Sequence, residues 1–105
     1  MKIPESIRIG GTEYAVKYVP NLRNGNYIAY GHIDYENSVI ELSDTDGVEH
    51  QKRCKILLHE ILHGILEAAS FNIDEETEEK VVDVLSKGLY QVLQDNGKRL
   101  FDIKD

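Results

Sequence analysis

The sequence predicts an α+β fold, in which a small antiparallel or mixed sheet of three to four strands is followed by two helices. Short stretches of alternating apolar and polar residues fill the first part of the chain, up to residue 42. Two stretches with helical periodicity follow, at 54–69 and 81–93. A chain of 105 residues forms one domain with a modest core, so we expect a single domain over residues 1–105.

The first predicted element is a β-hairpin. Residues Ile7–Val19 read IRIGGTEYAVKYV. Apolar and polar residues alternate on both sides of Gly10-Gly11, and a glycine pair at this place is typical of a hairpin turn. Pro20 ends the run, and the residues NLRNGN at 21–26 have turn chemistry that predicts a loop.

A second hairpin is predicted from the next two runs. Tyr27–Tyr35 reads YIAYGHIDY and Ser38–Leu42 reads SVIEL, with two polar residues between them. The sheet then has three or four strands. The sequence SDTDG at 43–47 is a polar turn that leads into the first helix.

The first predicted helix begins near Val48 or Glu49 and carries the stretch CKILLHEILHGILEAA at 54–69. Its apolar residues recur at helical spacing, and His59 and His63 lie on the flank of the stripe that they form. Histidines at the edge of a buried face can bind a metal ion in a cleft that is open to solvent. The stripe consists of Cys54, Leu58, Ile61, Leu62, Ile65, Leu66 and Ala69.

The second predicted helix begins at 72–74, where Asn72 and Glu75 match a capping pattern and acidic residues suit a helix amino terminus. Asn96-Gly97 predicts its end. We expect its apolar stripe to pack on the stripe of the first helix. This second stripe consists of Val81, Val82, Leu85, Leu89, Val92 and Leu93.

Composition limits the classes of partner and location. The 41% hydrophobic and 30% charged make-up is that of an ordinary soluble globular chain, and a net charge of −7 argues against nucleic acid as a partner. The single cysteine, Cys54, excludes an internal disulfide. We find no apolar run of signal-peptide or membrane-spanning length, so we expect no membrane segment and a cytoplasmic location.

The pentapeptide HEILH at 59–63 carries the predicted chemistry. On a helix, His59 and His63 are four residues apart, so both rings rise from one face and can bind a single metal ion. Glu60 lies about 100° around the helix from His59, where its carboxylate reaches a water at the ion more easily than the ion itself. We therefore expect Glu60 to be the catalytic general base. His32 and His50 are interpreted as surface histidines.

A catalytic zinc ion needs a third protein ligand, and the acids of the second helix are the candidates. On a helical wheel, Glu79 and Asp83 lie together on the flank of the apolar stripe, whereas Glu78 falls in its middle. We predict Glu79 as the third metal ligand, with Asp83 as the acceptor that orients a histidine. Glu78 is the alternative ligand, because an unpaired carboxylate in the core would be costly.

The residues of these two helices resemble those of a known group of enzymes. HEILHG followed by EKVVDVLSKGL is similar to the gluzincins, zinc peptidases with a glutamate as third ligand, and within them to the small ImmA/IrrE-type and SprT-like metallopeptidase domains of phages and mobile elements. Glu79, Val82, Asp83, Leu85 and Leu89 match the downstream helix of these families in turn. The preceding GHIDYENSVIEL resembles their strand pair, one strand of which binds extended substrate by main-chain pairing.

The expected function is therefore a zinc-dependent metallopeptidase that hydrolyses a peptide or protein substrate, with Zn²⁺ held by His59, His63 and Glu79 and with Glu60 as the base. The alternative is a metal-stabilised binding or assembly module of a phage or mobile element, without catalysis. A chance HExxH pattern on a packed helix is the remaining alternative, and the matching Glu79 and Asp83 of the second helix count against it. The substrate, the oligomeric state and the group that stabilises the transition state stay open, and Tyr27, Tyr30 and His32 are available for the last role.

Overall fold

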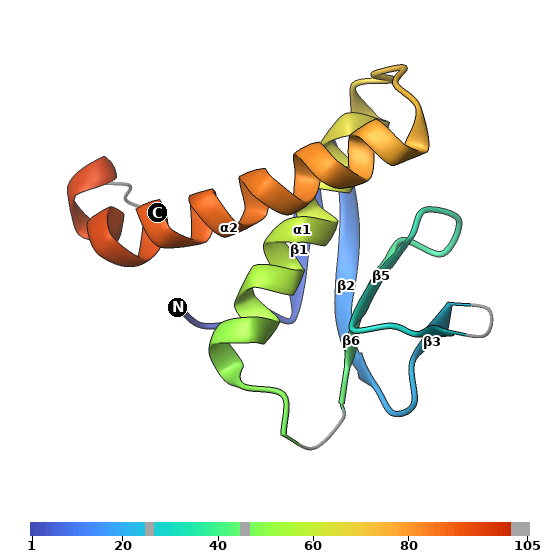
Figure 1. The fold of residues 1–105 in the computed structure, drawn as a ribbon, viewed down its shortest axis with the longest axis horizontal. Coiled ribbons are helices and arrows are strands. Elements are labelled where there is room, and N and C mark those ends of the chain that lie inside the picture. The colour runs from blue at the N-terminus through green and yellow to red at the C-terminus, as the bar shows by residue number, and fades with distance from the viewer. Residues whose placement is uncertain (25–26, 45–46, 102–105) are drawn as a thin grey trace.

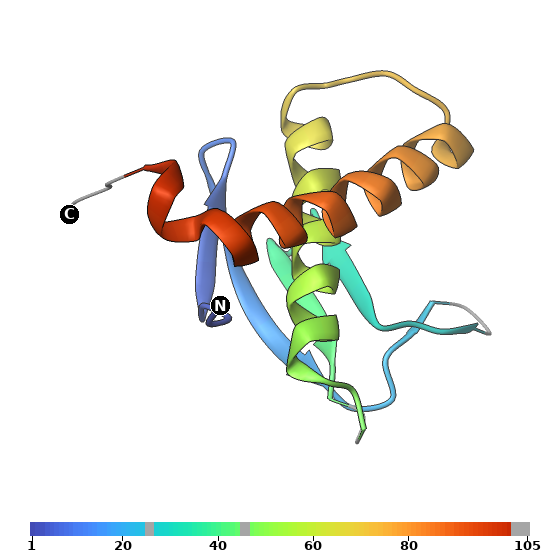
Figure 2. The same ribbon diagram turned by 60° about the vertical axis from the view of Figure 1, so that its left-hand side comes forward.

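A four-stranded sheet, a first helix and a second helix form three layers in this order. The computed structural model of the chain describes residues 1–24, 27–44 and 47–101. The sheet lies at the back of the view in Figure 2, α1 (His50–Ala68) runs across it, and α2 (Glu75–Leu100) crosses α1 on the side away from the sheet. In Figure 1 the C-terminal part of α2 extends past α1. The predicted α+β class, with a mixed sheet and two helices, is confirmed.

The sheet contains two hairpins joined through a parallel pair of strands. β1 (Ser6–Ile9) pairs antiparallel with β2 (Thr12–Val19), and β5 (Gly31–Asp34) pairs antiparallel with β6 (Val39–Ser43). β2 and β6 are parallel neighbours, so the strand order is β1-β2-β6-β5. β5 is therefore an edge strand of the sheet.

A glycine turn forms the first hairpin, and the strands that lead to the second hairpin are shorter than predicted. Gly10 and Gly11 have φ angles of +56° and +89°, the left-handed conformations that a two-residue hairpin turn requires. The predicted strand Tyr27–Tyr35 is divided: β4 (Tyr27–Ile28) pairs with β3 (Arg23–Asn24) in a small separate sheet, and β5 begins at Gly31. The predicted loop at 21–26 and the predicted turn at 43–47 each contain two residues outside the described part, 25–26 and 45–46.

α1 packs on the sheet with a different face from the predicted one. The buried residues are Cys54, Leu57, Glu60 and Gly64, whereas Ile65 of the predicted stripe is exposed. The core beneath α1 includes Ile9, Tyr14, Ile33, Ile40, Leu42 and Leu57. The predicted stripe was wrong because it left out Leu57, and the sheet lies against the side of α1 that carries Leu57, Glu60 and Gly64.

Gly64 allows the helix to approach the sheet closely. A Cβ atom at Gly64 would lie 3.0 Å from Ile9 Cδ1 and 3.1 Å from Ile33 Cδ1. A larger residue would therefore push α1 away from the sheet directly beside His63.

α2 begins later and ends later than predicted. Its N-cap is Asp74, which accepts a hydrogen bond from the Thr77 N–H at 2.9 Å, and not Asn72. The predicted stop at Asn96-Gly97 is wrong, because the helix continues to Leu100. Lys98 and Arg99 in the last turn suit the negative end of the helix dipole, which favours this extension.

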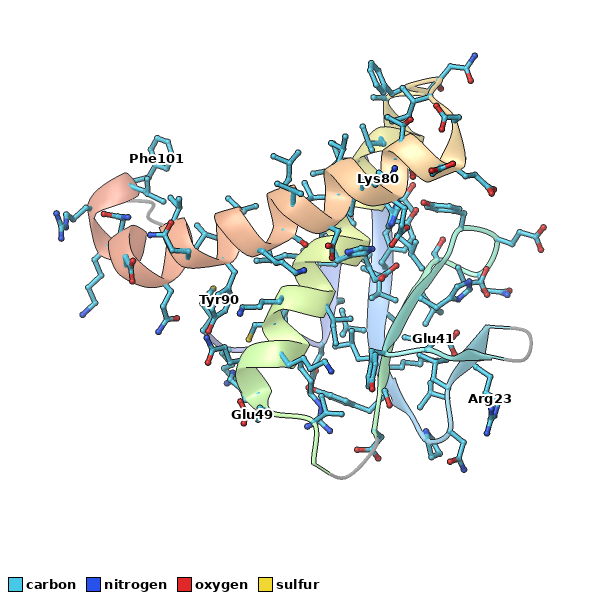
Figure 3. All side chains as sticks on the ribbon, in the orientation of Figure 1. Arg23, Glu41, Glu49, Lys80, Tyr90 and Phe101 are labelled. Atoms are coloured by element: carbon cyan, nitrogen blue, oxygen red, sulfur yellow. The ribbon has the colours of Figure 1, made fainter. Side chains whose placement is uncertain are left out.

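The buried face of α2 also differs from the prediction. Val82, Ser86 and Tyr90 are buried at spacings of four residues, and Ser86 satisfies its hydroxyl by donating to the Asp83 carbonyl oxygen at 3.1 Å. Figure 3 shows Tyr90 on the side of α2 that faces α1. The other members of the predicted stripe, apart from the half-buried Leu93, are exposed: Val81, Leu85, Leu89 and Val92. Within the described residues, neither helix is both long and apolar enough to span a bilayer.

Candidate metal centre

His59 and His63 present their Nε2 atoms to the same point. They lie one helical turn apart on α1, and their rings meet edge to face with centroids 4.8 Å apart and an interplanar angle of 64°. The two Nε2 atoms are 3.2 Å apart. At this distance one ring N–H can donate to the other ring nitrogen, and two unprotonated Nε2 atoms in the same positions can bind one cation.

Glu79 of α2 completes the group. Its Oε1 lies 2.8 Å from His59 Nε2, and its Oε2 lies 3.1 Å from His63 Nε2. The three residues offer ligand atoms that all lie within 4.8 Å of one another. The structure therefore brings together the three residues that the sequence analysis selected, one pair from α1 and one carboxylate from α2.

The spacing of these atoms fits a small tetrahedral cation. A zinc ion with bonds of about 2.0 Å holds neighbouring ligand atoms roughly 3.3 Å apart. The observed separations of 2.8, 3.1 and 3.2 Å need only a slight spread to reach that geometry. Two imidazoles and one carboxylate form a ligand set typical of catalytic zinc, which leaves a fourth position for water or substrate. The side chain of Glu79 is 62% exposed, so this fourth position can face the solvent.

The outer nitrogens of the two histidines face acidic residues of α2. His63 Nδ1 lies 2.6 Å from Glu78 Oε2, a hydrogen bond in which the ring N–H donates and the carboxylate accepts. This contact leaves the Nε2 lone pair of His63 free to bind a metal ion. Glu78, the alternative third ligand, thus lies at the far side of the ring. Asp83, the predicted orienting acceptor, is 4.0 Å from His59 Nδ1 and also receives Lys87 Nζ at 3.0 Å.

Glu60 is a buried carboxylate without a hydrogen-bond donor among the described residues. Only 7% of the residue is exposed, and it lies between α1 and β5. A Cβ atom at Gly31 would be 3.2 Å from Glu60 Oε2, so the edge strand passes directly beside the carboxylate. Burial raises the pKa of Glu60, while the nearby His59 and His63 partly lower it. Burial therefore makes this group a stronger base than an exposed glutamate.

These residues open into one cleft between β5, α1 and α2. Its volume is about 560 Å³, and its wall includes Gly31, His59, Glu60, His63 and Glu79. A cleft of this volume admits a few residues of an extended peptide or a small molecule. The predicted base and all three predicted ligands thus share one opening.

Other groups in the cleft escaped the sequence analysis. Tyr35 lines the wall, and burial together with the charges of Glu67 and Glu78 raises its pKa to about 12, so its phenol stays protonated at neutral pH and can donate a hydrogen bond. Lys52 and Lys55 also line the wall. Their spacing relative to His59, seven and four residues, was the available signal, because it places all three on one side of α1.

Two of the three residues considered for the stabilisation of a transition state line the same cleft, namely Tyr30 and His32. His32 Nδ1 lies 3.4 Å from Glu41 Oε1 of the neighbouring strand. The side chain of Tyr27 lies outside the described part of the structure. Tyr35 joins Tyr30 and His32 as a third available donor.

Comparison of the chain with protein-family models, curated proteins and solved structures finds no match. The resemblance to the gluzincins therefore depends on the residues of the HEILH helix and of α2 alone. The geometry of the cleft is an independent basis for assigning a function.

Proposed function

We propose that the protein is a zinc-dependent metallopeptidase whose ion is held by His59, His63 and Glu79. The observation that carries the proposal is the convergence of two Nε2 atoms and one carboxylate in the cleft that also contains the buried Glu60. A structural zinc site is usually closed by four protein ligands. Among the described residues this group has three ligands, and the side chain of one of them, Glu79, is exposed to solvent. A purely structural site also has no need of an unpaired carboxylate next to it.

Each residue has a defined role in this proposal. Zinc, when bound, supplies a Lewis acid that polarises a peptide carbonyl and acidifies water at neutral pH. The Glu60 carboxylate accepts a proton from the attacking water and then delivers it to the leaving nitrogen. Glu78 holds His63 with its Nε2 toward the ion, and Tyr35 is placed in the cleft wall where a neutral phenol can donate to a developing oxyanion.

A peptide substrate is favoured by the wall of the cleft. β5 is an edge strand, and an extended peptide can add to such an edge by main-chain hydrogen bonds. Lys52 and Lys55 lie over the rings of Tyr30 and Tyr90, at 3.9 and 5.3 Å from the ring centroids, and neither forms an ion pair with a described carboxylate. We expect acidic residues of a substrate to be favoured where Lys52 and Lys55 line the cleft.

We also propose that the protein works in the cytoplasm, as the sequence predicts.

The test is a comparison of the wild type with Glu60→Gln, both loaded with zinc, on casein and on a peptide library. We expect Glu60→Gln to lose about 10²- to 10⁴-fold in activity, the contribution of a general base. It should still bind zinc as the wild type does. Glu67→Gln, an exposed change of the same chemistry on the same helix, is the matched control and should stay active.

Two other outcomes would count against the enzyme. Equal activity of Glu60→Gln and wild type would remove Glu60 from the role of base. Zinc binding by the wild type without hydrolysis of any peptide would favour the alternative, a metal-stabilised binding or assembly module.

A further inference from the structure

The outer side of α2 carries an apolar surface on which no described element packs. We define the outer stripe as Val81, Val84, Leu85, Leu89 and Val92. Val84 is 68% and Leu85 is 53% exposed, so these large apolar side chains are open to solvent in the single chain. Exposed apolar patches of a few hundred Å² mark interaction sites in soluble proteins. The outer stripe is therefore a candidate interaction surface.

The outer stripe is separate from the surfaces that α2 already uses. On a helix with 100° per residue, its centre lies about 130° from the buried Val82, Ser86 and Tyr90 and nearly opposite Asp83 and Lys87, which line the cleft. None of the five stripe residues lines the cleft. A molecule that covers the outer stripe therefore leaves the candidate metal centre open.

The spacing of the stripe suits another helix. Val81, Leu85, Gly88 and Val92 follow one another at intervals of four, three and four residues, which is the seam of a coiled coil. Gly88 lies near the middle of the stripe, and a Cβ atom there would meet no atom within 4 Å. Between Leu85 and Leu89 it forms a notch where a second helix can come close or insert a side chain.

The charges along α2 indicate which helix fits. The first turn contains the exposed Glu75 and Glu76, which take no part in the candidate metal centre, whereas the last turn contains Lys98 and Arg99. A second α2 in the antiparallel direction would place its basic end against this acidic start, and the reverse at the other end, and it would also pair the two helix dipoles favourably. A parallel second copy would instead bring like charges together.

We propose that the protein forms a homodimer in which two α2 helices pack antiparallel through their outer stripes, with the two-fold axis near Gly88. In this arrangement Leu85 of one chain contacts the region of Val92 in its partner, and Lys98 and Arg99 of one chain lie near the acidic first turn of the other. Figure 3 shows Phe101 at the end of α2, beyond the part that packs on α1. The exposed Leu100 and Phe101 extend the apolar contact there. The dimer does not depend on the proposed peptidase activity, because the cleft faces away from the stripe.

The first test is the mass of the full chain in solution, by light scattering after size exclusion or by sedimentation equilibrium at micromolar concentrations. We expect twice the 12.0 kDa of one chain. Leu85→Glu should halve the mass, and its helical circular dichroism should stay unchanged because Leu85 is exposed in the single chain. The control Gln94→Glu adds the same charge to an exposed position outside the stripe and should stay dimeric. A wild type of single-chain mass, or a dimeric Leu85→Glu, would overturn the proposal.

The second test reports the direction of the helices. Near a two-fold axis a residue meets its own copy, so Gly88→Cys should form a disulfide between chains on mild oxidation. Val81→Cys lies two turns from the axis and should not, and the wild type with its buried Cys54 is the blank. Equal cross-linking of Gly88→Cys and Val81→Cys indicates parallel helices, and no cross-linking of Gly88→Cys indicates another interface. Either result contradicts the antiparallel dimer.

Discussion

α1 and α2 both supply residues to the candidate metal centre, but they are held in the molecule in different ways. α1 lies between the sheet and α2, with Leu57 in the main core and Gly64 in close contact with two strands. α2 packs on α1 through the narrow row Val82, Ser86 and Tyr90 and leaves its outer side uncovered.

The two halves of the candidate site therefore depend on different packing contacts. His59, His63 and Glu60 are placed by the well-packed helix, so their relative positions follow from the fold. Glu79 and Glu78 reach the histidines only while α2 is docked on α1. We therefore expect metal binding and docking of α2 to stabilise each other, since a ligand that binds only the docked state favours that state.

The largest effect on stability should come from truncating one buried side chain in each of the two packing surfaces. Leu57→Ala should lower the free energy of unfolding by about 2–5 kcal/mol, because it opens a cavity in the core under α1. Val82→Ala removes less volume and should cost roughly 1–3 kcal/mol. Urea denaturation of the metal-free protein measures both values.

The order of the two variants should be reversed when zinc affinity is measured in place of stability. Under conditions in which both variants are folded, Val82→Ala should weaken zinc binding more than Leu57→Ala, because Val82 holds the helix that carries Glu79. A Leu57→Ala protein that loses more zinc affinity than Val82→Ala would show that α2 is not the weaker part of the site.

A smaller effect is expected at the outer nitrogen of His63. Glu78→Gln keeps the shape of the side chain but removes the carboxylate that accepts the His63 Nδ1 proton at 2.6 Å. Loss of such an orienting partner typically lowers metal affinity about 10- to 100-fold, and a zinc titration by calorimetry measures it. Glu76→Gln is the matched control, because Glu76 is exposed and pairs with Lys80 on the surface. Equal affinity of the two variants would mean that Glu78 does not orient the ring.

The parts of the site that depend on short spacing could be predicted from the sequence. Two histidines four residues apart on a helix must share a face, so local geometry alone brings the His59 and His63 rings close together. Glu79 could be selected because it lies on the flank of the second helix, and any packing that joins the two flanks brings it to the histidines. The glycine turn of the first hairpin follows from a similarly local pattern. The parallel pairing of β2 with β6 joins strands far apart in the sequence and could not be predicted in this way.

The packing faces of the helices could not be predicted in the same way. α2 offers two rows at helical spacing, and the more apolar row, with Leu85 and Leu89, is the exposed one. The buried row contains Ser86, whose hydroxyl is satisfied within its own helix, so polarity was a poor guide to burial. Glu78 can orient His63 only because α1 and α2 pack together, and the sequence does not show how they pack. If the dimer exists, the more apolar row was a correct indicator of a core, but of one that forms between two chains.

The stoichiometry and ligand dependence of zinc binding test the candidate metal centre itself. Wild-type protein and the single variants His59→Ala, His63→Ala and Glu79→Ala would be titrated with zinc, and the metal retained after desalting would be measured. We expect one tightly bound zinc ion per wild-type chain and loss of tight binding in all three variants, with Glu67→Ala unaffected. Retention of zinc by Glu79→Ala at wild-type affinity, or by all three variants, would contradict a centre formed by His59, His63 and Glu79.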